Sequence, residues 1–182
     1  FRSEALKYFT EFWCSDNTDP IERLYIQWGF SQFFPAKAMC AHVTSWNSKT
    51  SVKFRTDVAS MCKLGFDMGL KELSEDELAY CQNAVANFNR LKPVILDGEL
   101  YRLVSPYESP LASLSYVSTD KQKAVVYFYQ TKDGNEPRVM LGGLDAHKKY
   151  RVEEVSQAKG VTSRFPANGK VFTGAELMEK GL

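Results

Sequence analysis

The residue pattern changes at Leu91-Lys92-Pro93, near the middle of the chain. Before this point, short apolar runs alternate with segments that repeat their apolar residues at helical spacing. After it, almost every apolar run is short, rich in β-formers and bounded by turn residues. A chain of 182 residues is long enough for one domain or two small ones. The change therefore predicts two domains, 1–94 and 95–182.

The first half contains two helices with clear start signals. In the first, Asp19 is a suitable N-cap, Pro20 fits the first helical position, and Glu22 follows three residues after Asp19. In the second, predicted over 74–92, Ser74 and a glutamate three residues later form a capping-box pattern. Both segments then carry apolar residues at helical spacing, which predicts amphipathic helices.

Short strand-like runs lie between these helices. The run 38–46 is expected to be a strand that passes into a loop at His42, and 63–69 a strand that ends in a turn. Strand–loop–helix units of this kind build (β/α)₈ barrels, but a whole barrel needs about 250 residues. The first half can supply only the last two or three units. We therefore expect the C-terminal units of a TIM barrel, and a chain that is the C-terminal part of a larger protein.

The second half is expected to be an antiparallel β-sandwich. Its turn dipeptides include Asp133-Gly134 and Asn168-Gly169, and its short runs alternate or are rich in aromatic residues. The predicted fold class is thus α/β plus all-β, with the end of a barrel followed by the sandwich. The expected strands are RLVSP, LASLSYVS, KAVVYFYQ, RVMLGGL, KKYRVEEV and GKVFTG.

Composition excludes some partners and leaves the compartment open. The formal net charge is +1, and no basic run is longer than Lys148-Lys149, so we expect neither nucleic-acid nor membrane binding. None of the four cysteines forms a CxxC pair, so no zinc site is expected and buried free thiols are favoured. There is no apolar stretch of 18 residues and no signal peptide, but the sequence begins at Phe1 rather than Met.

Asp16 is the leading candidate for a chemical role. In barrels of this type, active-site residues lie in loops just after strands, and Asp16 follows the run FTEFW. Asp19 already supplies the helix cap, so Asp16 has no structural task visible in the sequence. Partial burial near Trp13 would raise the pKa of its carboxyl group, as a general acid requires. On spacing alone, however, a local Asx-turn hydrogen bond is the favoured explanation of Asp16.

Other residues are weaker candidates. Trp13 could face a bound sugar or pack in the core. Asn17 could contact substrate, although a turn-shaping role is favoured, and His42 could line the cleft, although a hydrogen-bonded structural histidine is favoured. Asp67 is expected to be a turn or cap residue. Cys14-Ser15 has no histidine nearby in sequence to activate it as a nucleophile.

Residues 8–44 resemble the late-barrel segment of glycoside hydrolase family 36, the retaining α-galactosidases. The resemblance rests on the loop W-x-S-D-N-T-D, the helix ERL-x-I-Q-x-G and the strand end AHVT. RLVSPYES, GLDAHKKYRVEEV and FTGAELMEKGL are similar to that family's C-terminal β-sandwich, so the resemblance covers nearly the whole chain. It implies that Asp16 is the catalytic acid/base and that Trp13, Asn17 and His42 are candidates for substrate contact.

The resemblance also implies what this chain lacks. A retaining glycosidase needs a second carboxylate as nucleophile, about 5–5.5 Å from the acid/base. In the family this is the Asp of a Lys-x-Asp motif on an earlier strand, and no such motif occurs here. The Cys- and Gly-rich substrate-binding motif is also absent. We therefore expect the chain alone to be inactive.

The expected substrates are terminal α-galactosides of the raffinose type, with no cofactor and no metal. Family members often form homo-oligomers, so the full-length protein is a candidate for self-association. Two alternatives remain. One is a relative with altered chemistry, either an α-N-acetylgalactosaminidase or a transglycosylating raffinose or stachyose synthase. The other is a non-catalytic carbohydrate-binding β module.

Overall fold

The computed structural model describes residues 4, 7–46, 50–133 and 138–182. The chain divides into two compact units, Phe1–Phe88 and Asn89–Leu182. Helix α3 (Glu75–Asp97) begins in the first unit and ends in the second.

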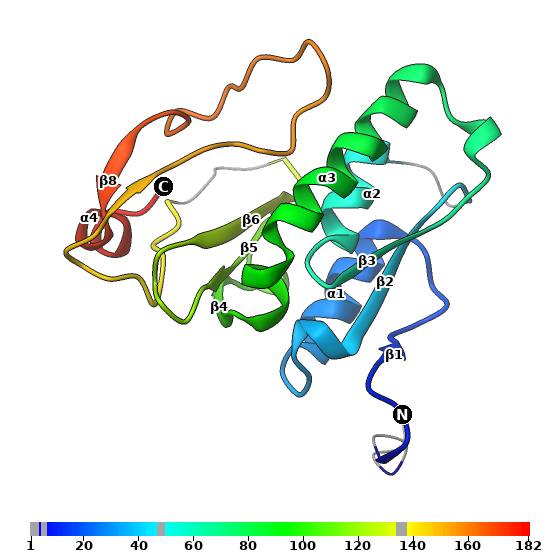
Figure 1. Ribbon diagram of the computed structural model, residues 1–182, viewed down its shortest axis with the longest axis horizontal. Helices are drawn as coiled ribbons and strands as arrows, with labels where there is room; N and C mark the ends of the chain where they lie inside the picture. Colours follow the sequence, from blue (N-terminus) through cyan, green and yellow to red (C-terminus); the bar gives the residue numbers. More distant parts are fainter. Residues whose placement is uncertain (1–3, 5–6, 47–49, 134–137) are drawn as a thin grey trace. The chain divides into compact units, whose positions relative to one another are not determined.

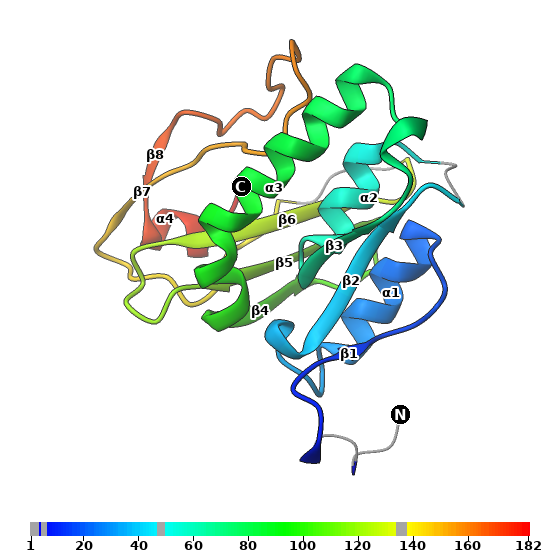
Figure 2. The ribbon, with the colours of Figure 1, turned by 45° about the vertical axis from the view of Figure 1, so that its right-hand side comes forward.

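The first unit is built on a parallel sheet. Its strands are β1 (Phe12–Trp13), β2 (Met39–Thr44) and β3 (Lys63–Asp67), with β2 in the centre (Figures 1 and 2). Helices α1 (Pro20–Phe30) and α2 (Val52–Ala59) connect successive strands and pack beside each other. Two 3₁₀ turns, η2 (Ala36–Ala38) and η3 (Leu70–Glu72), complete the unit. Parallel strands joined through helices are the repeating units of a (β/α)₈ barrel.

Helix α1 begins where its sequence signals predict. The backbone N–H groups of Ile21 and Glu22 both donate to Asp19 Oδ1, each at 3.0 Å, and Pro20 occupies the first helical position. Leu24 and Trp28 form the buried apolar stripe. The capping role predicted for Asp19 is confirmed.

Two boundary predictions are wrong. Strand β2 does not end at His42 but continues to Thr44, because His42 to Thr44 stay paired with Gly65 to Asp67 of β3. Helix α3 does not end before Pro93 but runs to Asp97. The reciprocal bonds between Ser74 and Glu77 at its start, 3.0 and 3.3 Å long, agree with the predicted capping box.

The second unit contains two antiparallel sheets. Strands β4 (Glu99–Val104), β5 (Leu111–Val117) and β6 (Ala124–Gln130) form the larger sheet, and β7 (Lys149–Arg151) pairs with β8 (Val171–Thr173). Every residue of the central strand β5 is buried. Helix α4 (Gly174–Glu179) follows β8 directly and begins with a Thr173–Glu176 capping box.

One face of the larger sheet forms the core between the two sheets. Tyr101 of β4, Val117 of β5 and Val126 of β6 lie on this face and pack in one apolar cluster with Tyr150 and Phe172 of the smaller sheet. The two packed antiparallel sheets agree with the predicted sandwich. The cluster also includes Leu141, Leu144 and Leu177.

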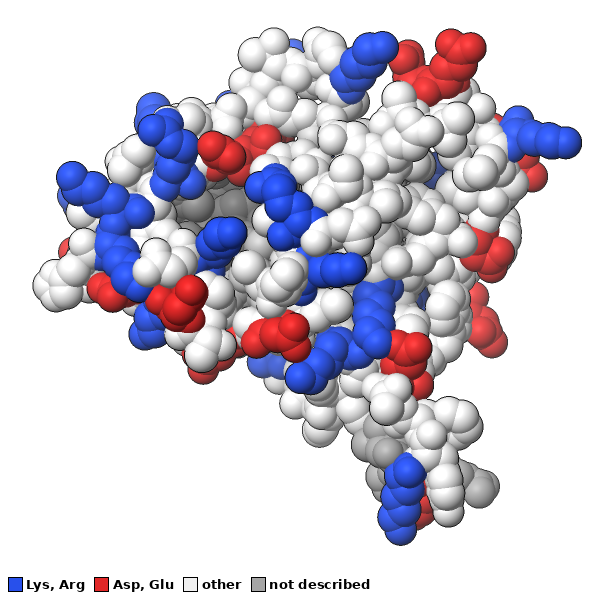
Figure 3. All heavy atoms as spheres, viewed as in Figure 1, with Lys and Arg blue, Asp and Glu red and all other residues white. Residues whose placement is uncertain are grey.

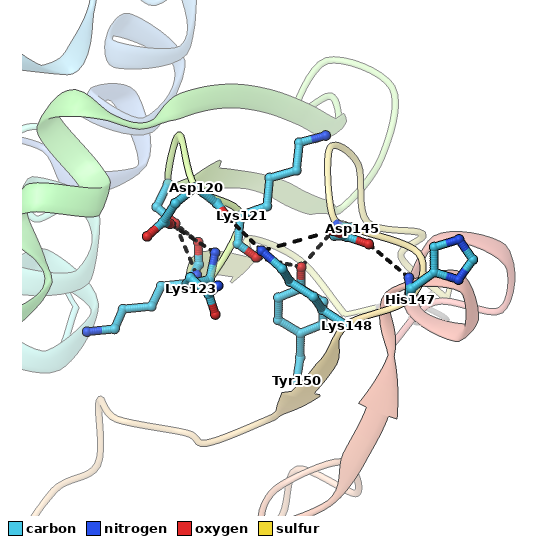
Figure 4. Close-up of polar contacts among 9 residues, drawn as sticks. Asp120, Lys121, Lys123, Asp145, His147, Lys148 and Tyr150 are labelled. Carbon is cyan, nitrogen blue, oxygen red and sulfur yellow. Dashed lines mark hydrogen bonds and ion pairs between the residues drawn. The ribbon is translucent and has the colours of Figure 1, made fainter.

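Polar contacts join the β5–β6 turn to the segment that enters β7 (Figure 4). Tyr150 Oη donates to the Lys121 carbonyl at 2.8 Å and accepts from the Asp145 N–H at 3.0 Å. Lys148 Nζ donates to the Asp120 carbonyl at 2.7 Å. Lys121, in this turn, has a φ of 54°, in the left-handed region. These contacts hold the two sheets together at one end.

The strand expected at 138–144 is not formed. Val139 exchanges two backbone hydrogen bonds with Leu182, of 3.1 and 3.0 Å, and Leu141 N–H donates to the Leu177 carbonyl at 3.0 Å. The segment therefore pairs with the chain end and with α4, not with a strand. Asn168-Gly169 lies in a turn before β8 rather than in a two-residue hairpin, and Gly134 lies outside the described residues.

The four cysteines are all free thiols. Cys14, Cys62 and Cys81 are buried, as predicted, whereas Cys40 is only partly buried. No helix among the described residues is long and apolar enough to cross a membrane. On the face drawn in Figure 3, Lys and Arg side chains are interspersed with Asp and Glu side chains.

Candidate active site

In the loop between β1 and α1, the side chains of Ser15, Asn17 and Asp19 accept hydrogen bonds from the backbone. Asn17 N–H donates to Ser15 Oγ at 3.1 Å, and Asp19 N–H donates to Asn17 Oδ1 at 3.0 Å. Asp19 in turn caps the helix. Local bonds of this type are how Ser, Asn and Asp side chains stabilise turns. Ser15, Asn17 and Asp19 thus hold the loop, and the Asx turn considered for Asp16 is made by Asn17 instead.

Asp16 has different surroundings. Its carboxylate makes no hydrogen bond to the other described residues, and it is exposed. The partial burial expected around it is therefore not supplied within the described part of this chain. It lies in the loop at the carboxyl end of β1, which is where barrel enzymes hold their catalytic groups.

The carboxyl ends of the three parallel strands bring further polar groups close to Asp16. His42 lies near the end of β2, and Asp67 is the last residue of β3. The charges of Asp16 and Asp67 both act on the His42 imidazole. Three strands that are separate in sequence thus gather Asp16, His42 and Asp67 at one edge of the sheet.

His42 and Trp13 form a stacked pair. Their ring centroids are 3.9 Å apart and their planes differ by 28°. His42 is only 9% exposed, whereas Trp13 is 48% exposed. Trp13 is therefore not a fully packed core residue, and part of its ring is open beside the Asp16 loop.

The pKa of His42 is lowered, chiefly because the ring is buried and next because the Arg23 guanidinium is close. The carboxylates of Asp67 and Asp16 act in the opposite direction but are outweighed. His42 Nδ1 is buried and has no partner among the described residues. Near neutral pH the ring is uncharged, so it can offer one donor and one acceptor.

Cys14 does not have the properties of a nucleophile. Burial raises the pKa of its thiol to about 11, against the smaller opposing effect of Arg23. The group is therefore protonated near neutral pH, and the thiolate is the reactive form. Among the residues that the structure describes, no three His, Cys, Asp or Glu side chains are grouped as metal ligands.

Arg23 is a residue of this site that was not predicted. It lies in α1 with only 3% of its surface exposed, and its Nη1 donates to the Ser15 carbonyl at 2.8 Å. Gln27, four residues later and also buried, donates to the Val58 carbonyl at 2.8 Å. The signal in the sequence was a pair of polar residues four apart, directly beside the apolar stripe of Leu24 and Trp28.

Family comparisons cover both halves of the chain. The family described as Melibiase matches residues 1–98, and the family described as Glycosyl hydrolase family 36 C-terminal domain matches residues 111–182. Alpha-galactosidase 2 of Hypocrea jecorina is 32% identical over the whole chain, and so is Alpha-galactosidase AgaA of Geobacillus stearothermophilus. In both cases the chain spans 24% of the relative's length.

Solved structures give the same result. The GH36 alpha-galactosidase AgaB of Geobacillus stearothermophilus superposes with a TM-score of 0.83 at 31% identity, over 97% of this chain and 24% of that one. The similarity covers the α/β unit and the sandwich together, which confirms the predicted fold class of a barrel end followed by a β-sandwich. The chain therefore belongs to the Melibiase family, and its second half matches the C-terminal domain of glycosyl hydrolase family 36.

Proposed function

We propose that the protein containing this chain hydrolyses terminal α-linked galactosyl residues, with Asp16 as the general acid and base. The main support is the difference in hydrogen bonding between Asp16 and its neighbours in the loop 15–19. The side chains of Ser15, Asn17 and Asp19 accept hydrogen bonds from backbone N–H groups, whereas that of Asp16 is exposed at a strand end. Relatives named α-galactosidases match the whole chain, which favours this activity over the alternatives considered above.

In the first step, Asp16 donates its proton to the glycosidic oxygen while the bond from C1 to that oxygen breaks. A second carboxylate attacks C1 from the opposite face and forms a galactosyl–enzyme ester. In the second step, Asp16, now a carboxylate, accepts a proton from water as the water attacks C1. The bond between C1 and the ester oxygen breaks, which releases galactose and restores the nucleophile as a free carboxylate. The nucleophile is not supplied by a Lys-x-Asp motif of this chain. We propose that it comes from another part of the protein.

The neighbouring residues have supporting roles in this proposal. The half-open ring of Trp13 offers an apolar face to the sugar, and His42 supports that ring from behind by stacking. Asn17 keeps its Nδ2 donors for substrate while its Oδ1 holds the turn. A bound sugar would cover Asp16 and exclude water from around its carboxyl group.

Raffinose-type oligosaccharides are the proposed substrates. Variants of Geobacillus stearothermophilus AgaA have been solved in complex with raffinose and with stachyose, at TM-scores of 0.83 and 0.78 to this chain. Both sugars carry a terminal α-linked galactose, the unit that the proposed mechanism releases. Self-association of the complete protein is a further proposal, taken from the family.

The test is an Asp16→Ala substitution in the complete protein, assayed on α-galactosides with different leaving groups. The aryl oxide of an activated aryl galactoside can depart without being protonated, so kcat/KM for this substrate should fall little. For raffinose, whose leaving group needs the proton, kcat/KM should fall by about 10²–10⁴-fold. Asp133→Ala is the control, because Asp133 is an exposed aspartate of the second unit; it should leave both rates near those of the parent. Equal losses for all substrates, or no loss, would remove Asp16 from the mechanism.

A further inference from the structure

Arg23 joins the Asp16 loop to the neighbouring strand. Its Nη1 donates to the Ser15 carbonyl at 2.8 Å, and its Nη2 approaches the Cys40 carbonyl of β2 at 3.5 Å. The Ser15 carbonyl belongs to the peptide group that also contains the Asp16 nitrogen. Because a peptide group is planar, a bond that fixes this oxygen also fixes the nitrogen and Cα of Asp16.

Asp16 is held from its other side as well. The next N–H, that of Asn17, donates back to Ser15 Oγ at 3.1 Å. The backbone on both sides of Asp16 is thus held by hydrogen bonds, while its carboxylate has no partner in the described part of the chain. A carboxylate that must meet a glycosidic oxygen within hydrogen-bond distance needs such support, because a displacement of about 1 Å can cost 10²-fold in rate.

The position is costly for an arginine. Arg23 is 3% exposed and has no ion pair with a carboxylate among the described residues, and burial lowers the pKa of its guanidinium. A buried charge held only by carbonyl groups is expensive, and an apolar side chain would fill the same space without that cost. The guanidinium carries its donors in a rigid planar array that here faces two carbonyls, whereas an apolar side chain has no donor and lysine has a single ammonium on a flexible stem.

We propose that Arg23 is a positioning residue for the acid/base Asp16. This inference rests on the proposed function of Asp16. Arg23 sets the peptide that carries Asp16 at a fixed place relative to β2, and through β2 relative to His42. Its charge also helps to keep His42 neutral.

The chain offers a matched control in Arg55 of α2. Arg55 is 8% exposed, its Nη1 donates to the Thr44 carbonyl at the end of β2, and it has no ion pair with a carboxylate among the described residues. Both arginines line one small cavity of about 10 Å³, together with Gln27 and His42. Arg55 thus shares the burial, the type of acceptor and the cavity of Arg23. It makes no hydrogen bond to the loop 15–19.

The experiment compares Arg23→Lys and Arg55→Lys in the complete protein, first by hydrogen exchange. We expect Arg23→Lys to speed exchange of the N–H groups of Asn17 and Asp19, and Arg55→Lys to leave them at the parent rate. If Arg23→Lys does not yield folded protein, Arg23→Gln takes its place, since it keeps an amide donor on a shorter side chain. Unchanged exchange at Asn17 and Asp19 would overturn the proposal.

The second readout is the leaving-group dependence of kcat/KM. Arg23→Lys should lose on the order of 10²-fold on raffinose and much less on an activated aryl galactoside, whereas any loss in Arg55→Lys should be equal for both. In an Asp16→Ala background, Arg23→Lys should cause little further loss, because the two changes act through one group. Independent, additive losses would overturn the proposal. If Asp16→Ala itself shows no leaving-group dependence, the function proposed for Asp16 fails, and the exchange rates alone decide whether Arg23 holds the loop.

Discussion

Asp16 and Asp19 are three residues apart in one loop and have different tasks. Asp19 Oδ1 accepts hydrogen bonds from two backbone N–H groups, each at 3.0 Å, and so caps the start of a helix. Asp16 accepts none from the described residues, although its backbone is held on both sides. Two carboxylates with such different surroundings are suited to different roles, one structural and one chemical.

His42 gives a residue-scale prediction about pH. Its folded-state pKa is lowered from the ordinary value of 6.5 by burial and by Arg23, so the unfolded chain takes up a proton first as the pH falls. The free energy of unfolding should therefore decrease as the pH drops through about 6.5 towards the folded-state pKa. The His42→Gln variant should lack this component, because it has no group to protonate there.

Urea unfolding followed by tryptophan fluorescence measures this directly. Trp13, Trp28 and Trp46 all lie in the first unit, where His42 is found. His147→Gln, which removes the other histidine of the chain, is the control and should follow the parent curve. If His42→Gln kept the full pH dependence of the parent, another group would be responsible.

At the scale of helices and strands, the first residues of a helix can be predicted from the sequence more accurately than its last residues. Helix starts depend on local bonds, such as those of Asp19 and Ser74, and local bonds can be inferred from spacing. The end of α3 depends on tertiary contacts. Pro93 costs about 3 kcal/mol inside a helix, but Val94 and Ile95 beyond it are 5% and 1% exposed. Burying two such side chains contributes roughly 1.5–3 kcal/mol each, which offsets the proline.

Two strand errors have the same kind of cause. A polar residue interrupts an apolar run at His42, which predicts a strand end there, yet pairing with β3 and stacking on Trp13 keep His42 in the sheet. Residues 138–144 have strand-like composition, but Leu182 and Leu177 supply the hydrogen-bond partners of that segment. Composition indicates that a segment is extended or apolar. It does not indicate which distant backbone will pair with it.

The cap of α1 gives an element-scale prediction. Asp19→Ala removes the acceptor of the Ile21 and Glu22 N–H groups, which should cost about 1 kcal/mol. Hydrogen exchange of these two amides should become faster by roughly fivefold, which is the rate equivalent of that energy. Asp19→Asn keeps an acceptor oxygen and should stay near the parent rates. Slow exchange in Asp19→Ala would mean that another group caps the helix.

At the scale of the whole molecule, the chain combines a parallel α/β unit with an antiparallel sandwich. The pattern change at Leu91-Lys92-Pro93 falls inside α3, the helix that links the two compact units. The fold class and the candidate Asp16 could be predicted from the sequence, because motifs and turn patterns are local. Arg23 could not, because its partners Ser15 and Cys40 are 8 and 17 residues away and only the folded backbone brings them together.

The central claim, that Asp16 is the acid/base of a retaining α-galactosidase, is tested most directly by azide rescue. In the Asp16→Ala form of the complete protein, an activated galactoside should still form the galactosyl–enzyme. Hydrolysis of this intermediate should then be slow, because no base accepts the proton of the attacking water. Azide is already anionic and needs no base, so it should restore turnover and give α-galactosyl azide, the product of two inversions. An absence of rescue would contradict the account, and β-galactosyl azide would show instead that Asp16 is the nucleophile.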